Sequence, residues 1–314
     1  MIQPRPEPAA PGAAGVRRNF ATPSARSCVL TACLFLLLPG CAGRTSAPGA
    51  HGGLESATTE PAAPASSPAR PLAERDPLAY IRLVTENTRR LEQYTLKLIR
   101  QERRGFGPFC RLQEPEEILC WYRRQPFSIR LLWTDPAVKY GESTYVAGQQ
   151  NDRVRFTPRV GLFGLKPPIV RVGVQLPVIW GETKYPVTDF GIERLMVKTL
   201  DCIARARGRH RIEYLGIEPA PVTAQPAHRL RLTYPADQHE APVQELFVDA
   251  VTDLPVAHYS RFLSGELDAA YFYTELNADV VLTDEDFLLA AERAALTFSG
   301  DAPAAAGVAP AGVQ

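Results

Sequence analysis

The chain has 314 residues, with 35 lysines and arginines against 34 aspartates and glutamates. This balance argues against a dedicated nucleic-acid-binding protein, which normally carries a basic excess. A hydrophobic content of 45% excludes a wholly disordered chain, whereas 29 prolines, roughly twice the average usage, predict long segments outside the core.

The N-terminal segment has the features of an export signal. An apolar run at residues 28–38 follows three arginines and is shorter than the ~20 residues that a membrane-spanning helix needs. It leads into Leu-Pro-Gly-Cys41, which resembles the lipobox of bacterial lipoproteins. The resemblance implies cleavage before Cys41, acylation of its thiol and, with Ala42 following, a lipid-anchored position at the outer membrane, facing the periplasm. The alternative is an ordinary signal peptide with a chance cysteine.

Composition divides the chain into four predicted regions. Ala, Gly, Ser, Thr and Pro supply 24 of the 30 residues at 42–71, which leaves too little apolar surface to offset the entropy of ordering. We therefore predict a cleaved signal peptide at residues 1–40, a flexible tether at 41–75, a folded domain at 76–298 and a disordered tail at 299–314.

The folded domain is predicted to begin with a helix and to continue as strands. Asp76 before Pro77 is a favoured helix start, because aspartate caps free N–H groups and proline suits the first turn. From Tyr94 the apolar residues alternate, as in a strand with one buried face. The first strands are expected at 94–104, 117–124, 127–134, 145–148 and 153–157, with a hairpin between the last two.

The second half opens with an apolar segment punctuated by glycine and proline, residues 158–186. It predicts a lid or binding loop or, equally, two more strands. Thr188 is the expected cap of an amphipathic helix at 189–206. Strands follow at 211–217, 227–234, 244–248, 256–263 and 269–276, and acidic residues from Asp284 open a last helix.

This order of elements predicts an α+β protein. We expect one curved antiparallel sheet of about ten strands, an unclosed β-barrel, with helices over its concave face.

Several short sequence motifs occur in a characteristic order between about residues 80 and 288. They are Gln101-Glu102-Arg103, Arg124-Gln125-Pro126-Phe127-Ser128, Tyr185-Pro186-Val187-Thr188 with Gly191-Ile192, Asp249 with Leu254-Pro255, Tyr273, and Leu282-Thr283-Asp284. Together they resemble a bacterial family of exported proteins, a domain of unknown function of the DUF1571 type. The strand pattern is similar to the lipoprotein carriers of the LolA and LolB type and to the RseB type. That resemblance implies an unclosed barrel whose hydrophobic cavity holds acyl chains.

Enzyme motifs are absent from the sequence. It has no Gly-x-Ser-x-Gly elbow, no His-Glu-x-x-His and no phosphate-binding loop. The histidines do not have metal-ligand spacing. We therefore expect no catalysis, no cofactor and no metal.

Glu102 is the most informative polar residue of the predicted sheet. Alternation places it on the face of Leu96 and Leu98, where a carboxylate must be paired or hydrated. Arg124 or Arg130 on a neighbouring strand is the expected partner. The functional hypothesis is a site that orients a polar headgroup at the rim of a cavity. The commoner alternative is a cross-strand salt bridge at one end of the sheet.

A ligand cavity would be lined by apolar side chains of the sheet and of the loop. The candidates are Leu96, Leu98, Trp133, Phe163 and Trp180, together with Trp121, Phe247, Tyr271 and Tyr273. At strand spacing such residues are more often part of a filled core, so the cavity hypothesis depends chiefly on the resemblance in fold.

Cys110 and Cys120 flank a turn-rich connection and are predicted to form a disulfide in an oxidising compartment. The alternative is that both of them, and Cys202, are free and buried.

Two functions are consistent with the sequence. The first is a non-catalytic envelope lipoprotein, held in the membrane by lipid on Cys41, whose half-barrel binds a lipid, an acyl chain or a lipoprotein. The second is a structural or interaction lipoprotein of the envelope with a filled core and no small-molecule ligand. An apolar cavity of about 300 Å³ or more would favour the first.

Overall fold

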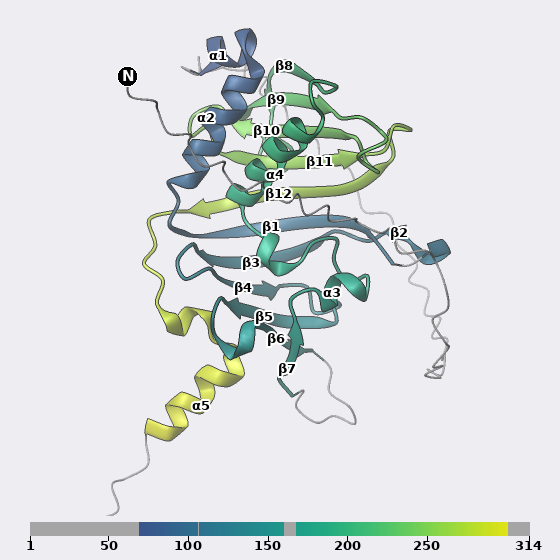
Figure 1. Cartoon of the computed structure of the whole chain (residues 1–314). Helices are drawn as coiled ribbons and strands as arrows, with labels where there is room; N and C mark the ends of the chain where they lie inside the picture. The colour runs from purple at the N-terminus through teal and green to yellow at the C-terminus, as the bar shows by residue number, and fades with distance from the viewer. Residues whose placement is uncertain (1–68, 106, 160–167, 301–314) are drawn as a thin grey trace, which may run out of the picture. The chain divides into compact units, whose positions relative to one another are not determined.

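An antiparallel sheet of twelve strands organises the residues that the computed structural model describes, which are 69–105, 107–159 and 168–300. Eleven strands follow the order β7-β6-β5-β4-β3-β1-β12-β11-β10-β9-β8, and β2 pairs with β1 beside this path (Figure 1). Within these residues no ladder joins β7 to β8, so the sheet is unclosed, as predicted. The strands are β1 (Gln93–Arg104), β2 (Arg111–Leu112), β3 (Glu116–Arg123), β4 (Ser128–Trp133), β5 (Tyr140–Val146), β6 (Arg153–Pro158), β7 (Val170–Gly173), β8 (Arg211–Pro219), β9 (Pro226–Thr233), β10 (Val243–Asp249), β11 (Pro255–Arg261) and β12 (Leu267–Asn277).

The first and last of the described strands, β1 and β12, meet in the middle of the sheet. β1 pairs with β3 on one side and with β12 on the other, so that Arg100 lies opposite both Glu116 and Tyr271. The strands β3 to β7 step outward to one edge, and β12 back to β8 step outward to the other. Residues near positions 100 and 270 are therefore neighbours, although 170 residues separate them in the chain.

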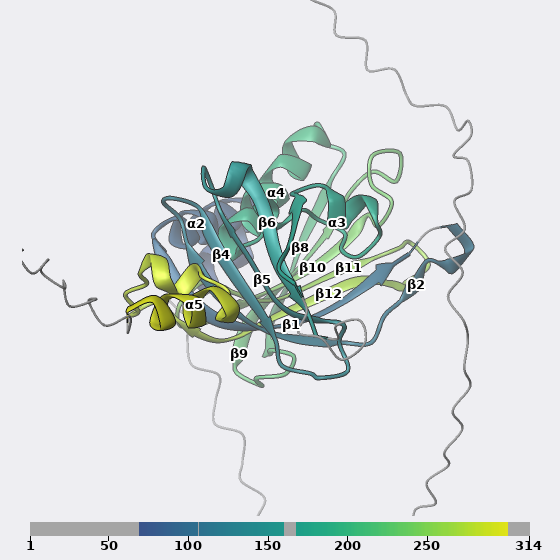
Figure 2. The same ribbon diagram turned by 90° about the horizontal axis from the view of Figure 1, so that it is seen from below.

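Helices cover the two faces of the sheet unequally. They are α1 (Arg70–Arg75), α2 (Pro77–Arg89), α3 (Leu176–Ile179), α4 (Ile192–Arg205) and α5 (Ala290–Gly300). The elements α3 and α4 lie over one face, whereas α5 lies on the opposite side (Figure 2). We call the face beneath α3 and α4, which carries Leu96 and Leu98, the inner face. On the outer face, the Thr144 hydroxyl of β5 donates to the Phe287 carbonyl just before α5.

The inner core follows from the alternation in the sequence. Tyr94, Leu96 and Leu98 of β1 are buried on the inner face, and Ile192, the first residue of α4, packs in the same cluster. A second cluster joins α1, α2 and the rest of α4 to β9 and β10. The start of α2 is as predicted, because the Asp76 carboxylate accepts a hydrogen bond of 2.9 Å from the Ala79 N–H. The predicted hairpin at residues 145–157 is confirmed as β5 and β6.

The helix boundaries differ from the prediction at three places. Residues 70–75, expected in the tether, form α1, whose Ala73 is fully buried. The helix predicted from residue 189 begins at Ile192, because the 3-10 turn η4 (Val187–Asp189) and an extended Phe190 come first. Thr188 is therefore not its cap. Residues Asp284–Phe287 form the 3-10 turn η5, closed by a capping box, and α5 starts only at Ala290.

The segment predicted as either a lid or two strands contains parts of both. Residues 160–167, with the candidate Phe163, lie outside the described residues. After them β7 pairs with β6 and extends the sheet by one strand. The chain then leaves the sheet through α3 and covers the inner face. The predicted signal peptide, Cys41 and most of the predicted tether also lie outside the described residues.

The predicted disulfide between Cys110 and Cys120 is wrong, because Cys110, Cys120 and Cys202 are all free. Cys120 lies opposite Leu96 on β1 and is 1% exposed, whereas Cys110 is exposed and precedes Arg111, which lies opposite Arg104. These two positions on β1 are eight residues apart, roughly 26 Å along a strand, far beyond the reach of a disulfide.

Candidate functional site

A cavity of about 570 Å³ lies between the inner face and the segment that runs from α3 into α4. Eight consecutive strands of the sheet, from β6 to β10, contribute side chains to its wall. Ligand pockets typically have volumes of about 300–1,000 Å³, so this cavity could enclose a small molecule. Trp180 and Tyr185 lie at its rim and are 47% and 45% exposed.

One part of the cavity wall is apolar because every second residue of each strand points to the inner face. The apolar residues of the sheet that line the cavity are Leu98, Ile118, Leu131, Val154 and Phe156, from β1, β3, β4 and β6. An alkyl chain placed against them would leave water without burying any polar group.

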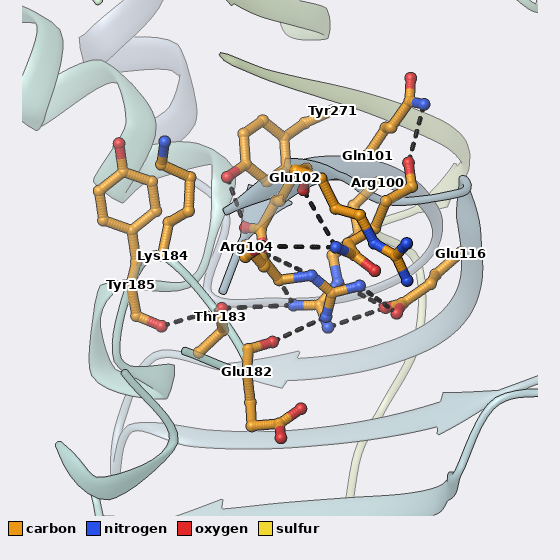
Figure 3. Close-up of polar contacts among 12 residues, drawn as sticks. Arg100, Gln101, Glu102, Arg104, Glu116, Glu182, Thr183, Lys184, Tyr185 and Tyr271 are labelled. Carbon is orange, nitrogen blue, oxygen red and sulfur yellow. Dashed lines mark hydrogen bonds and ion pairs between the residues drawn. The ribbon is translucent and has the colours of Figure 1, made fainter. Parts of the chain in front are cut away.

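A charged cluster lies beside the apolar wall, where β1 and β3 pair, and its members Arg100 and Glu102 line the cavity. Arg100, Glu102 and Arg104 follow one another at every second position of β1, and Glu116 of β3 faces them (Figure 3). Arg100 donates from Nε and Nη2 to Glu116 Oε2 at 3.0 and 2.9 Å, and Arg104 Nη2 donates to Glu116 Oε1 at 2.5 Å. Trp133 Nε1 also donates a hydrogen bond to Glu116 Oε2, at 3.3 Å. Two guanidinium groups thus face two carboxylates, and the formal charges balance.

Glu102 has an unequal environment at its two oxygens. The Tyr271 hydroxyl donates to Oε1 at 2.6 Å. Oε2 lies 3.9 Å from Arg100 Nη1 and 3.9 Å from Arg104 Nε, too far for a hydrogen bond, and it has no hydrogen-bond partner. Arg104 Nε also lacks one. Glu102 is only 2% exposed and lines the cavity.

The partners predicted for Glu102 are wrong. Arg124 pairs instead with Glu92 and Glu193, at 3.4 and 3.3 Å. Arg130 points to the outer face, where its Nε donates to Glu142 at 2.5 Å and its guanidinium lies over Trp121. The alternation of β4 explains this placement, because Leu131 rather than Arg130 faces the cavity.

Burial and charge set the protonation of the groups around Glu102. Burial, and then the Glu102 carboxylate, raise the pKa of Tyr271 well above its usual value, so its hydroxyl keeps the proton that it donates. Burial lowers the pKa of His258 to about 4, and this ring stacks on Tyr271 with centroids 5.7 Å apart. His258 is therefore neutral near pH 7. For Glu116, burial acts to raise the pKa, but Arg100 and Arg104 outweigh it and lower the pKa.

The segment between α3 and α4, residues 180–191, covers the cavity, and we call it the cover. It is attached to the sheet through the same arginines. Arg104 Nη1 donates to the Glu182 carbonyl at 2.7 Å, and Arg100 Nη1 lies 3.4 Å from the Thr183 hydroxyl (Figure 3). The next residue, Lys184, forms an ion pair with Asp268. The cluster thus positions the segment between α3 and α4, and a second cavity of about 650 Å³, lined by Arg104 and Glu116 among others, adjoins it at Glu182.

The structure brings together only some of the residues proposed for ligand binding. Those that line the cavity are Leu98, Glu102, Trp133, Trp180, Tyr271 and Tyr273. Leu96 packs in the adjacent core. Trp121 lies under Arg130 on the outer face, and Phe247 belongs to a small separate cluster.

Sequence reasoning missed Arg100, Arg104 and Glu116. The signal for the arginines was present, because they stand two residues before and after Glu102 and so share its face. No comparable signal identified Glu116, because its contact with Arg100 depends on the register of β1 and β3.

Two further structural features concern the described part of the chain. No group of three or more His, Cys, Asp or Glu side chains there is arranged to hold a metal ion. None of its helices is long and apolar enough to cross a membrane.

The sequence profile of a family described as "Protein of unknown function (DUF1571)" matches residues 91–295. This chain belongs to the DUF1571 family. The match runs from just before β1 into α5 and so contains the whole sheet and the cavity wall, and it confirms the predicted family. None of the curated proteins matches the chain in sequence.

Solved structures similar to this DUF1571 chain include MucB, with 18% identity over 73% of this chain and 66% of MucB, at a TM-score of 0.41. The MucA/MucB complex of Pseudomonas aeruginosa matches at 19% identity over 68% of this chain and 61% of that chain, with a TM-score of 0.41. A LolA superfamily protein from Nitrosomonas europaea matches at 10% identity over 67% and 97% of the two chains, with a TM-score of 0.30. The chain spans less than two thirds of these MucB chains, and the likeness concerns the fold alone.

Proposed function

We propose that this protein is a non-catalytic binding protein of the bacterial cell envelope that holds the acyl chain of a lipid or lipoprotein in its cavity. The observation that carries the proposal is the 570 Å³ cavity with an apolar wall built from neighbouring strands. A structural protein with a filled core, the alternative function, would leave no such volume. Each methylene group that leaves water contributes about 0.8 kcal/mol, so a long acyl chain needs few polar contacts for affinity.

The polar groups of the cavity support binding rather than catalysis. The hydrogen bonds of Arg100 and Arg104 go mainly to Glu116 and to the cover, which is a structural use. His258 and Ser260 both line the cavity, but a histidine whose pKa is about 4 is a weak base at neutral pH.

Acyl-chain binding can be tested by titrating the purified protein with a fluorescent probe that carries a long acyl chain and an uncharged amide head group. We expect saturable binding that long-chain amphiphiles displace. The Trp180→Asp variant should bind the probe about tenfold more weakly, because it removes an apolar side chain from the rim and adds a charge. Leu263→Asp, at an exposed leucine that does not line the cavity, is the control and should bind like the wild type. Absence of saturable binding would favour the structural alternative.

The proposal includes a lipid anchor at Cys41, supported by the Leu-Pro-Gly-Cys41 sequence after the apolar run. A lipid on this thiol would hold the protein at the outer membrane, facing the periplasm. We expect the wild type to fractionate with membranes and the Cys41→Ala variant to be released into the soluble fraction. Cell fractionation followed by immunoblotting measures this. A Cys41→Ala protein that stays in the membrane fraction until detergent is added would refute the anchor, without bearing on the cavity.

A further inference from the structure

We propose that the cavity selects acyl compounds whose uncharged head group donates a hydrogen bond to Glu102, a hydroxyl or an amide N–H, and discriminates against free carboxylates. The inference rests on the proposed function and specifies the chemical class of its ligand.

The first step of the argument is the missing hydrogen bond of a buried carboxylate. Buried polar atoms in proteins are nearly always hydrogen-bonded, and a charged oxygen without a partner is costly. Glu102 Oε2 is such an oxygen, and the side chain lines the cavity beside the stacked rings of Tyr271 and His258. An oxygen of a carboxylate accepts hydrogen bonds, so the group that completes it must be a donor.

The second step is the geometry around that oxygen. Arg100 Nη1 and Arg104 Nε lie on either side, each 3.9 Å from Oε2. Arg104 Nε has no hydrogen-bond partner of its own. A hydroxyl can donate to Oε2 and accept from an arginine N–H at the same time, and a carboxamide can do so through its N–H and its carbonyl. A carboxylate has no proton to donate and satisfies only the arginines.

The third step is charge. Arg100 and Arg104 are balanced by Glu102 and Glu116, so the cluster offers no net positive charge to an anion. The nearby Lys184 is engaged by Asp268. A fatty-acid carboxylate placed at this end of the cavity would be repelled by the Glu102 carboxylate, and only arginine N–H groups already shared with Glu102 and Glu116 would compensate its lost hydration. An uncharged head group avoids both the repulsion by Glu102 and the loss of a charged group's hydration.

The test compares four ligands with the same 18-carbon unsaturated chain as competitors of the fluorescent probe on the purified protein. They are oleamide, N,N-dimethyloleamide, oleate and 1-monooleoylglycerol. We expect oleamide to bind about tenfold more tightly than oleate, as suits a hydrogen bond to a charged group. N,N-dimethyloleamide is uncharged but has no N–H, and it should bind about tenfold more weakly than oleamide although its two added methyl groups favour burial. The monoacylglycerol tests the hydroxyl form of the head group against the amide form.

Variants connect this preference to Glu102. Glu102→Gln keeps the size of the side chain, removes its negative charge and adds an N–H donor. It should reduce or reverse the preference for oleamide over oleate. Glu266→Gln, whose 69% exposed side chain pairs with Arg103, does not line the cavity and should keep the wild-type preference.

The outcomes separate this inference from the proposed function. If all four ligands compete equally, the acyl chain binds but Glu102 does not distinguish the head groups. That result refutes this inference and leaves the proposed function standing. The same holds if oleamide is preferred and Glu102→Gln leaves the preference unchanged. If no ligand competes and the probe itself does not bind saturably, the proposed function fails. The comparison of the two amides uses only the wild-type protein. It can therefore refute the inference even if Glu102→Gln folds poorly.

Discussion

Replacing Glu116 by alanine is expected to lower the free energy of unfolding by about 3–5 kcal/mol, the usual result of removing one partner from a buried ion pair. Glu116 accepts hydrogen bonds from Arg100, Arg104 and Trp133 Nε1, and its side chain is almost fully buried. Without it, two buried guanidinium groups face Glu102 alone. Urea unfolding of the purified variant and wild type measures the difference.

Glu117→Ala is the matched control for this prediction. Glu117 follows Glu116 on β3 but points to the other face, and its 41% exposed side chain pairs with Lys97 at 3.5 Å. Exposed pairs of this kind contribute about 0–1 kcal/mol, so the control should unfold nearly like the wild type. Equal destabilisation by Glu116→Ala and Glu117→Ala would contradict the structural role of the cluster.

The stability difference should also depend on pH. Burial acts to raise the pKa of Glu116, but Arg100 and Arg104 outweigh it and hold the pKa below the usual 4.5. A carboxyl whose pKa is lower in the folded chain stabilises the fold above its unfolded pKa, and this contribution is lost as the pH falls through the folded pKa. The gap between wild type and Glu116→Ala should therefore narrow below about pH 4.5. A gap that stays constant from pH 7 to pH 3 would be inconsistent with the lowered pKa.

Gly191→Ala is expected to destabilise the protein by about 3 kcal/mol, because only glycine tolerates this backbone conformation and there is little space for a side chain. Gly191 has φ 119° and ψ 149° immediately before α4. A Cβ at this position would lie 3.2 Å from Tyr122 and 3.3 Å from the Tyr94 hydroxyl, two stacked rings of the inner core. Thermal and urea unfolding both measure the loss.

Gly208→Ala provides the comparison for Gly191→Ala. Gly208 also has a positive φ, of 80°, but a Cβ there would meet nothing within 4 Å. It should cost only the roughly 1–2 kcal/mol of the left-handed backbone. Gly191 also lines the cavity, immediately before α4, so Gly191→Ala should weaken binding of the fluorescent probe, whereas Gly208→Ala should not. Similar effects of the two variants on stability and binding would contradict the packing described around Gly191.

Most of the sheet was predictable because its signal is local. In β1, the alternation of Tyr94, Leu96 and Leu98 with polar residues records which side of the strand faces the core, and no distant contact is needed to interpret it. The short elements were not predictable in the same way. The two-residue strand β2 and the turn η4 depend on what lies beside them, and a few residues carry too weak a pattern.

The candidate site illustrates the same division at the level of single residues. Alternation correctly placed Glu102 on the inner face with Leu98. It could not identify the partners of Glu102, because Tyr271 reaches it only through the pairing of β1 with β12, 169 residues away in the chain. The prediction of Arg130 as a partner was wrong, and the alternation of β4 could have excluded it, because Arg130 is one residue out of phase with Leu131, which lines the cavity.

The sequence by itself determined the family, the antiparallel α+β fold and the face of the sheet on which Glu102 lies, because these depend on residue order and on periods of two and 3.6 residues. Only the tertiary structure decided that Cys110 and Cys120 lie far apart, that Glu116 meets Arg100 and Arg104, and that the inner face encloses a cavity. Strand register and the path of the cover between α3 and α4 set these features. Both arise from contacts between segments that are distant in sequence, and such contacts leave no periodic pattern in the chain.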